Sequence, residues 1–339
     1  LYLTGIASFL IVMFSFIIPL SVDIDNQIAS NNDTKINNSK KDFEKVLSGE
    51  SIDDKEKVDE GLDLSNILED VFKFDELPED TVRLSASTIE QLFKDTNYSL
   101  SEVRRTKKVK PIRLSLLPNE MKSIENSGKR KNLFIKIILP LVLEENNRII
   151  IDRKKLFTIL NKNKNSKDEI KWLNQKFKQY GVVNKDLATL KVRMDIVPVS
   201  LAIAQAAKET GWGTSRFAIE GNALFGQWTW SGEGIKPAGA DTNATYKVMK
   251  FNVLKASVRA YQRNLNTHSS YKKFRFIRAQ LRDDNKKLDS LKLAEYLDNY
   301  AQTGTEYTKV LKQIIQQNQL KDFDEVKLLP LSVKYKNII

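Results

Sequence analysis

The longest helical pattern in the chain covers residues 129–162. Its apolar positions, among them Leu133, Ile137 and Leu141, recur close to the 3.6-residue period of an α-helix. Pro140 should kink this helix rather than end it, because a proline inside a helix removes one backbone hydrogen bond. Since the pattern stays apolar over many turns, we expect the helix to line a core.

Shorter helical patterns occupy much of the remaining chain. The pattern over 166–180 begins with Ser166 and has Glu169 three residues later, which is the spacing of a capping box. The other predicted helices cover residues 63–74, 87–95, 184–195, 253–267, 271–283, 290–301 and 305–319.

Residues 196–230 are denser in small residues, glycine and tryptophan than the rest of the chain. Pro198 suits a first helical turn and Ser200 can cap it. Good helix formers follow, and Gly211 is the expected stop. Glu209 is therefore predicted to lie in the last turn of this helix.

A carboxyl group in that last turn is opposed by the helix dipole. Trp212 adds an apolar neighbour three residues later. Both effects favour the protonated acid, which is the form that a general acid needs near neutral pH. The alternative interpretation of Glu209 alone is a solvated surface carboxylate.

A glycine-rich stretch over residues 231–251 interrupts the helical pattern and ends in an alternating segment from Tyr246 to Phe251. We expect a small lobe there, with a short β-hairpin.

The composition excludes several kinds of catalytic site. The 339 residues contain no cysteine and one histidine, His268. A cysteine nucleophile is excluded, and a Ser-His-Asp triad or a histidine-based zinc site is not expected. Acid–base chemistry would fall to Glu, Asp, Tyr or Lys, and no metal or cofactor is implied.

Charge is distributed unevenly along the chain. The net charge is +12, although residues 23–80 contain 18 acidic and 7 basic residues. The remainder is strongly basic, which suits an anionic polymer but is equally explained by a lysine-rich composition. Charge alone gives no argument for nucleic-acid binding, and no nucleic-acid partner is predicted.

The two ends of the chain differ from its middle. Residues 1–22 are uncharged and mostly apolar, and about 20 such residues can span a membrane, so we expect a signal anchor or a signal peptide. Residues 23–102 are expected to form an acidic, largely disordered tether, and residues 103–128 a connector. Residues 323–339 are expected to form a loosely packed tail.

Two motifs carry a family resemblance. They are Glu209-Thr210-Gly211-Trp212-Gly213 and Asn222-Ala223-Leu224-Phe225-Gly226. With the segments 251–275 and 297–320, they resemble the glucosaminidases of glycoside hydrolase family 73, and most of all the bacterial Bax-type glucosaminidase domain.

The resemblance implies a mainly α, lysozyme-like helical domain over residues 129–322, with a small β-hairpin lobe beside a cleft. It implies a peptidoglycan hydrolase that cleaves N-acetylglucosaminyl bonds, with peptidoglycan or a related N-acetylglucosamine polymer as partner. With residues 1–22 as membrane segment, the catalytic domain would lie in the cell envelope, anchored at the inner membrane and facing the periplasm, or be exported.

The resemblance also assigns catalytic roles. Glu209 is the expected general acid, and Tyr300 in NYAQTGTEY matches the tyrosine of the family's Y-A-T motif. Many family members carry a second glutamate in the β lobe within a T-T-E-Y-like string, which this chain lacks. Asp241 lies closest to that position, with Glu220 and Glu233 as alternatives.

Further side chains are candidates for binding the substrate. Trp228 and Trp230 offer flat apolar faces for sugars, whereas Trp212 and Phe225 are expected to pack in the core. The remaining candidates are Asn222, which could bind the substrate or a loop carbonyl, Gln205, on the same helix face as Glu209, and Tyr307.

Two other functional classes stay open at this point. A lytic transglycosylase also centres on one glutamate in a helix and releases an anhydro product. A non-catalytic peptidoglycan-binding module would use the same aromatic residues without cleavage.

Overall fold

The computed structural model describes residues 64–72, 81–229, 234–237 and 246–330. The chain divides into a unit of residues 1–64 and a unit of residues 65–339, and the second unit contains the folded domain. The predicted membrane segment over residues 1–22 lies outside the described residues. Within the described ranges, no helix combines the length and the apolar character needed to cross a bilayer.

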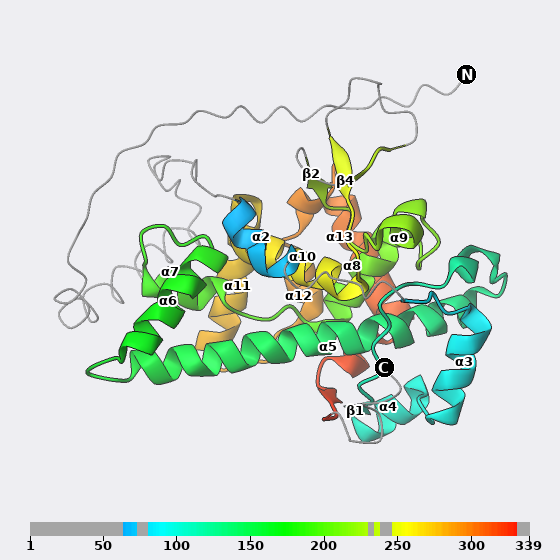
Figure 1. Ribbon diagram of the computed structural model, residues 1–339, viewed down its shortest axis with the longest axis horizontal. Helices are drawn as coiled ribbons and strands as arrows, with labels where there is room; N and C mark the ends of the chain where they lie inside the picture. The colour runs from blue at the N-terminus through cyan, green and yellow to red at the C-terminus, as the bar shows by residue number, and fades with distance from the viewer. Residues whose placement is uncertain (1–63, 73–80, 230–233, 238–245, 331–339) are drawn as a thin grey trace. The chain divides into compact units, whose positions relative to one another are not determined.

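The described part is mainly helical, with two small sheets (Figure 1). It is the lysozyme-like helical domain with a small β lobe that the sequence predicts. The helices are α2 (Leu64–Phe72), α3 (Ala86–Asp95), α4 (Leu100–Thr106), α5 (Ser127–Leu160), α6 (Lys167–Gln179), α7 (Leu187–Arg193), α8 (Val199–Thr210), α9 (Arg216–Gly221), α10 (Leu254–Thr267), α11 (Lys272–Asp283), α12 (Ser290–Ala294) and α13 (Thr305–Gln317). Short 3₁₀ turns are η1 (Asn119–Ser123), η2 (Ser269–Tyr271), η3 (Asp298–Tyr300) and η4 (Leu320–Phe323).

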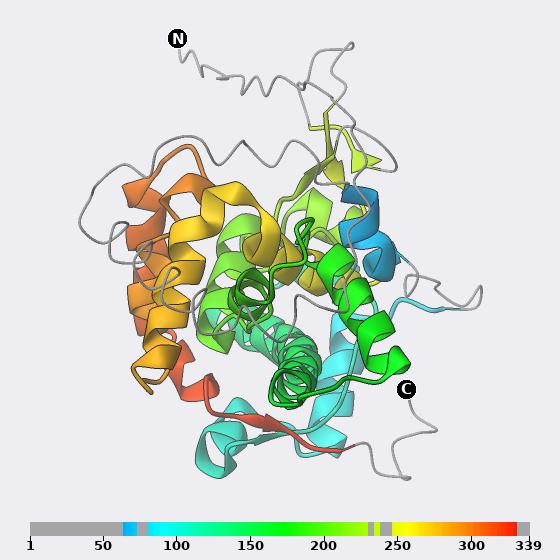
Figure 2. The same ribbon diagram turned by 90° about the vertical axis from the view of Figure 1, so that its left-hand side faces the viewer.

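Helix α5 is the longest element, and Figure 2 shows it almost end-on, with other helices beside it. Its start is capped by Asn126, whose side chain accepts from the Lys129 N–H. As expected, the helix continues through Pro140. Every residue from Leu133 to Leu143 except Lys136 is buried, so this half of the helix is surrounded by the core.

Helix α8 packs against α5, α13, α12 and η4. All of its residues from Val199 to Ala207 are buried. Its alanines allow the close approach of neighbouring helices that this burial requires. Contrary to the prediction, Ser200 does not cap the helix. Its backbone N–H and its hydroxyl both donate to Asp324.

The β lobe is a three-stranded antiparallel sheet rather than a single hairpin. Its strands are β2 (Trp228–Thr229), β3 (Gly234–Ile235) and β4 (Lys247–Met249), in the order β2-β4-β3. The register places Trp228 opposite Val248, Thr229 opposite Lys247, Gly234 opposite Met249 and Ile235 opposite Val248.

The folded part begins earlier than the sequence predicts. Two of the short helices expected within the tether are present as α2 and α3. Ile89 and Phe93 of α3 and Leu100 of α4 belong to the main hydrophobic core. Residues 86–102 are therefore part of the domain, because their apolar side chains pack in its main core.

The folded part also continues beyond residue 322, into the expected tail. Phe323 and Val326 are buried in the main core. Strand β5 (Lys327–Leu328) then pairs in parallel with β1 (Lys108–Val109), Lys108 lying opposite Lys327 and Val109 opposite Leu328. Residues 331–339 lie outside the described residues.

The C-terminal half of α5 has a smaller core of its own, formed with α6 and α7. The predicted capping box at the start of α6 is present: Ser166 Oγ accepts from the Glu169 N–H, and Glu169 Oε2 accepts from the Ser166 N–H.

Candidate active site

Helix α8 ends in a tight left-handed turn just after Glu209. Gly211, Trp212 and Gly213 have φ of 57°, 63° and 83°. A side chain at Gly213 would meet the Phe134 ring at 3.0 Å, so only glycine fits there. Thr210 joins helix and turn, because its hydroxyl donates to the Ala206 carbonyl and accepts from the Gly213 N–H. The turn therefore fixes where the last helical turn, and Glu209 on it, faces.

Glu209 is half-buried and has one hydrogen-bond partner in the described part of the chain. Tyr307 of α13 donates to Glu209 Oε1 at 2.8 Å. Burial raises the pKa of the Glu209 carboxyl, while the Tyr307 hydrogen bond and the charge of Lys208 act in the opposite direction. The net result is a raised pKa, the direction that the sequence predicts.

Behind Tyr307 the hydrogen bonds continue into the core. Gln205 Nε2 donates to the Tyr307 hydroxyl at 3.1 Å, and the Tyr261 hydroxyl of α10 donates to Gln205 Oε1 at 2.6 Å. All three side chains are buried. Gln205 therefore lies behind Glu209 as a support and does not face solvent as a substrate-binding group would.

The loop over residues 222–226 closes the other side of Glu209. Gly226 has φ of 62°, and a Cβ added there would lie 3.2 Å from Glu209 Oε2. Phe225 is stacked on Tyr261, with ring centroids 3.8 Å apart. The Asn222 side chain donates to the Phe251 and Asn252 carbonyls, so it holds a loop rather than facing a ligand.

Tyr300 supports this loop. Its hydroxyl donates to the Phe225 carbonyl at 2.8 Å, and its ring is stacked on Tyr307 with centroids 5.5 Å apart. Of the two tyrosines singled out from the sequence, Tyr307 is the one that contacts Glu209, although the motif match favours Tyr300. Tyr300 fixes the position of Tyr307 and of the loop.

The arrangement is a carboxyl group with a raised pKa, held by one neutral hydrogen-bond donor at the end of a buried helix. Comparisons with known proteins identify the family. The family model of mannosyl-glycoprotein endo-beta-N-acetylglucosaminidase, named Glucosaminidase, matches residues 184–320. Protein bax of Escherichia coli (strain K12) is 33% identical over 214 residues, which cover 60% of this chain and 75% of that protein.

This chain belongs to the glucosaminidase family. Its domain is of the Bax type. No solved structure gives a significant match. The glucosaminidase domain points to a glycosidase family, to a glycan such as peptidoglycan as the substrate class, and to the cell envelope or the exterior as its location.

The aromatic candidates of the glucosaminidase domain fall into two groups. Trp228 on β2 is 48% exposed and packs edge-on against Tyr246. Phe225 is buried, and Trp212 is half-buried against Phe134, which agrees with their expected core roles. Trp230 lies outside the described residues.

The second catalytic group of the glucosaminidase domain remains a prediction. Asp241 and Glu233 lie outside the described residues. Glu220 of α9 is exposed and pairs with Arg216 at 3.5 Å. Within the described ranges, no second carboxylate is hydrogen-bonded to Glu209, and no cluster of His, Cys, Asp or Glu could hold a metal ion.

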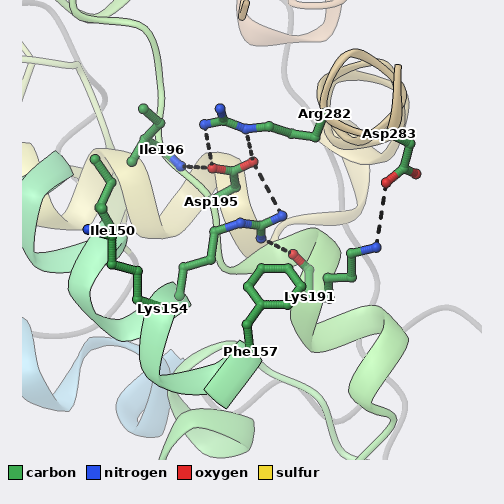
Figure 3. Close-up of a pocket in the computed structure, with 9 residues that line it drawn as sticks. Ile150, Lys154, Phe157, Lys191, Asp195, Ile196, Arg282 and Asp283 are labelled. Carbon is green, nitrogen blue, oxygen red and sulfur yellow. Dashed lines mark hydrogen bonds and ion pairs between the residues drawn. The ribbon is translucent and has the colours of Figure 1, made fainter. Parts of the chain in front are cut away.

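A separate hollow of about 510 Å³ is lined in part by Asp195, just before α8 (Figure 3). Arg282 contacts both oxygens of Asp195 at 3.1 Å, the Ile196 N–H donates to Oδ1 at 2.8 Å, and Arg153 lies 3.9 Å away. Although burial acts in the opposite direction, the charge of Arg278, followed by Arg153 and Arg282, lowers the pKa of Asp195 and favours its ionised form. A permanently paired carboxylate cannot serve as a general acid.

One residue of the site carried no signal in the sequence. Tyr261 lies in the segment 251–275, but nothing there distinguishes it from other core tyrosines. The available clue is physical: a buried tyrosine hydroxyl needs a partner.

Proposed function

We propose that this protein is an endo-β-N-acetylglucosaminidase that cleaves peptidoglycan, with Glu209 as general acid. The observation that carries the proposal is the environment of Glu209. Its carboxyl is half-buried, has a raised pKa and accepts a hydrogen bond from a neutral tyrosine rather than from a cation. A raised pKa extends the pH range over which the carboxyl holds a proton that it can release to a leaving oxygen.

The chemistry follows the pattern of glycoside hydrolysis. The proton of Glu209 passes to the glycosidic oxygen while the electron pair of the breaking C1–O bond moves to that oxygen. A water molecule adds its oxygen to C1 and releases a proton to a base. Asp241 is the candidate for that second group from the sequence. Trp228 is proposed as a platform for a sugar ring, because its exposed indole lies on the β lobe.

The test uses the full chain, Glu209→Gln and Glu306→Gln, each incubated with purified peptidoglycan. Glu306 is an exposed glutamate on α13, paired with Lys309, and its substitution controls for the loss of one negative charge. We expect new reducing N-acetylglucosamine ends by mass spectrometry from the unmutated protein and from Glu306→Gln. Glu209→Gln should lower the rate by about 10²–10⁴-fold, the usual contribution of a general acid.

Other products would change the proposal. Anhydro-muramic ends would reassign the protein to the lytic transglycosylases. Equal rates for the unmutated protein and Glu209→Gln would remove Glu209 from its role. Binding of peptidoglycan without cleavage would indicate a binding module.

A further inference from the structure

Three buried side chains behind Glu209 form a chain of hydrogen bonds with a defined direction. They come from three different helices: Tyr261 from α10, Gln205 from α8 and Tyr307 from α13. The bonds run from Tyr261 to Gln205, from Gln205 to Tyr307 and from Tyr307 to Glu209 Oε1. Among the described residues, Glu209 Oε2 has no hydrogen-bond partner.

The distances agree with the orientation of the Gln205 amide. The contact with the Tyr261 hydroxyl is 2.6 Å, and the contact with the Tyr307 hydroxyl is 3.1 Å. O–H···O hydrogen bonds are typically shorter than N–H···O bonds, so the carbonyl oxygen of the amide faces Tyr261 and the nitrogen faces Tyr307. An amide nitrogen only donates, and Tyr307 therefore accepts from Gln205.

This direction restricts the remaining hydroxyl. Tyr307 has a single proton, and it is directed at Glu209 Oε1. An Oε1 that accepts from Tyr307 cannot itself carry a proton directed at Tyr307. In a neutral carboxyl the carbonyl oxygen is the stronger acceptor, so the Tyr307 hydrogen bond favours the acid proton on Oε2, the oxygen that lies nearest Gly226.

We propose that Tyr261, Gln205 and Tyr307 are positioning residues that hold Glu209 Oε1 as an acceptor and keep the acid proton on Oε2. This inference rests on the proposed role of Glu209 as general acid. After the proton leaves Oε2, the same Tyr307 hydrogen bond stabilises the carboxylate that remains. Gln205 and Tyr261 act only through Tyr307 and do not touch the substrate.

Other groups near Glu209 do not take the place of the Tyr307 hydrogen bond. Tyr271 of η2 and Tyr300 of η3 influence the same region electrostatically and stay neutral, since burial raises the pKa of each. Lys208, next to Glu209 on α8, is exposed. In the described part of the chain, Tyr307 is the group that contacts the Glu209 carboxyl directly.

The test compares Tyr307→Phe, Tyr261→Phe and the double variant in the full chain. Each single change removes one hydroxyl and keeps the ring. Tyr180→Phe is the matched control, because Tyr180 is equally buried and its hydroxyl has no hydrogen-bond partner among the described residues. Thermal unfolding checks that every variant is folded.

Two measurements apply to each variant. The first is the pKa of Glu209 by ¹³C NMR titration of labelled glutamate carboxyls, with the signal assigned from its loss in Glu209→Gln. The second is kcat and KM against pH with purified peptidoglycan. The titration needs no activity, so failure of the proposed function and failure of the positioning chain give different results.

Tyr307→Phe should raise the pKa of Glu209 further, since the ionised form loses its donor. It should lower kcat about tenfold with KM unchanged, the usual scale for one hydrogen bond to a charged group. Tyr261→Phe should shift both in the same direction by less, because the Gln205 amide becomes free to turn. Tyr180→Phe should shift neither.

The double variant shows whether the Tyr261 and Tyr307 hydroxyls act on Glu209 in series or independently. If the hydroxyls act in series, the double variant behaves like Tyr307→Phe alone. Effects of the two substitutions that multiply would overturn the proposal. An unchanged Glu209 pKa and kcat in Tyr261→Phe would overturn it as well.

Discussion

The buried carboxylates of this protein occupy two kinds of surroundings. Glu145 on α5 is almost fully buried between Arg148 and Arg259, with the Arg259 Nε 3.1 Å from Glu145 Oε2. Although burial acts in the opposite direction, these arginines lower the pKa of Glu145 to about 2. Glu209 has a tyrosine and a glutamine behind it instead, and burial raises its pKa.

The difference shows how a basic chain can raise the pKa of a carboxyl that lies away from its cations. Cations hold Glu145 and Asp195 in their ionised forms, and these residues join helices together. The neutral Tyr307 hydroxyl fixes the position of Glu209 and favours its ionised form less than an arginine would. A carboxyl can therefore be rigid and still exchange a proton, provided that its partners carry no charge.

The largest effect on the free energy of unfolding is expected when a buried carboxylate loses one of its arginine partners. Arg259→Met removes one partner of Glu145 and leaves a less compensated charge in the core. The free energy of unfolding should fall by about 3 kcal/mol at pH 7. Urea unfolding measures the loss, and Glu145→Gln in the same chain should recover part of it.

The same pair gives a pH signature. Because the folded pKa of Glu145 lies below its unfolded value, its contribution is present above about pH 4 and is lost as the pH falls toward 2. The acid loss should be smaller in Arg259→Met. An equal acid loss in both proteins would show that the pair does not govern it.

A smaller effect is expected at Gly226, which leaves room for Glu209. In Gly226→Ala the residue is strained at φ of 62°, and its Cβ lies 3.2 Å from Glu209 Oε2. The unfolding free energy should fall by about 1–2 kcal/mol. The rate on peptidoglycan should fall by about tenfold, as expected for a displaced catalytic group.

Gly304→Ala is the matched control for that substitution. Gly304 also has a positive φ, of 54°, but a Cβ there would meet nothing within 4 Å. Because its ψ of −121° belongs to a backbone region that glycine alone adopts readily, Gly304→Ala should lose at least as much stability and keep its activity. A similar loss of activity in both variants would assign the effect to backbone strain instead of contact with Glu209.

Signals that lie close together in the sequence predicted the local structure well. The stop at Gly211, the capping box of α6 and the place of Glu209 in a last helical turn each depend on a few neighbouring residues. The Tyr261–Gln205 hydrogen bond joins residues 56 positions apart. No local pattern encodes such a contact, because it exists only after α8 and α10 have packed.

The same reason explains why the sequence favours one tyrosine and the structure another. The motif match points to Tyr300, whereas contact with Glu209 is made by Tyr307, seven residues later on α13. Which of two stacked tyrosines reaches a carboxyl depends on how η3 and α13 dock. The roles of Asp241 and Trp230 stay predictions from the sequence.

The expected tail shows this limit at the opposite end of α8. Asp324 lies within the charged segment after α13, so local composition favoured a loose end. In the folded protein its carboxylate accepts from the Ser200 N–H and from the Ser200 hydroxyl, both at 2.8 Å. Burial raises the pKa of Asp324 to about 6, against the effect of these hydrogen bonds.

Asp324→Asn should give the smallest effect. The folded pKa of Asp324 lies above its unfolded value, so the folded state binds the proton more tightly and this contribution to stability declines as the pH rises from about 4 through 6. Asparagine can keep hydrogen bonds to Ser200 without a charge. Between pH 4 and 7, Asp324→Asn should therefore escape a loss of about 1 kcal/mol that the unmutated protein shows, after allowance for partial exposure. Asp324→Ala, measured by the same urea unfolding, should lower stability at both pH values because both hydrogen bonds from Ser200 in the first turn of α8 are lost. Parallel pH profiles for the unmutated protein and Asp324→Asn would mean that Asp324 contributes to stability only through its hydrogen bonds to Ser200. Of the two carboxyls at the ends of α8, Glu209 would then be the one whose charge state matters.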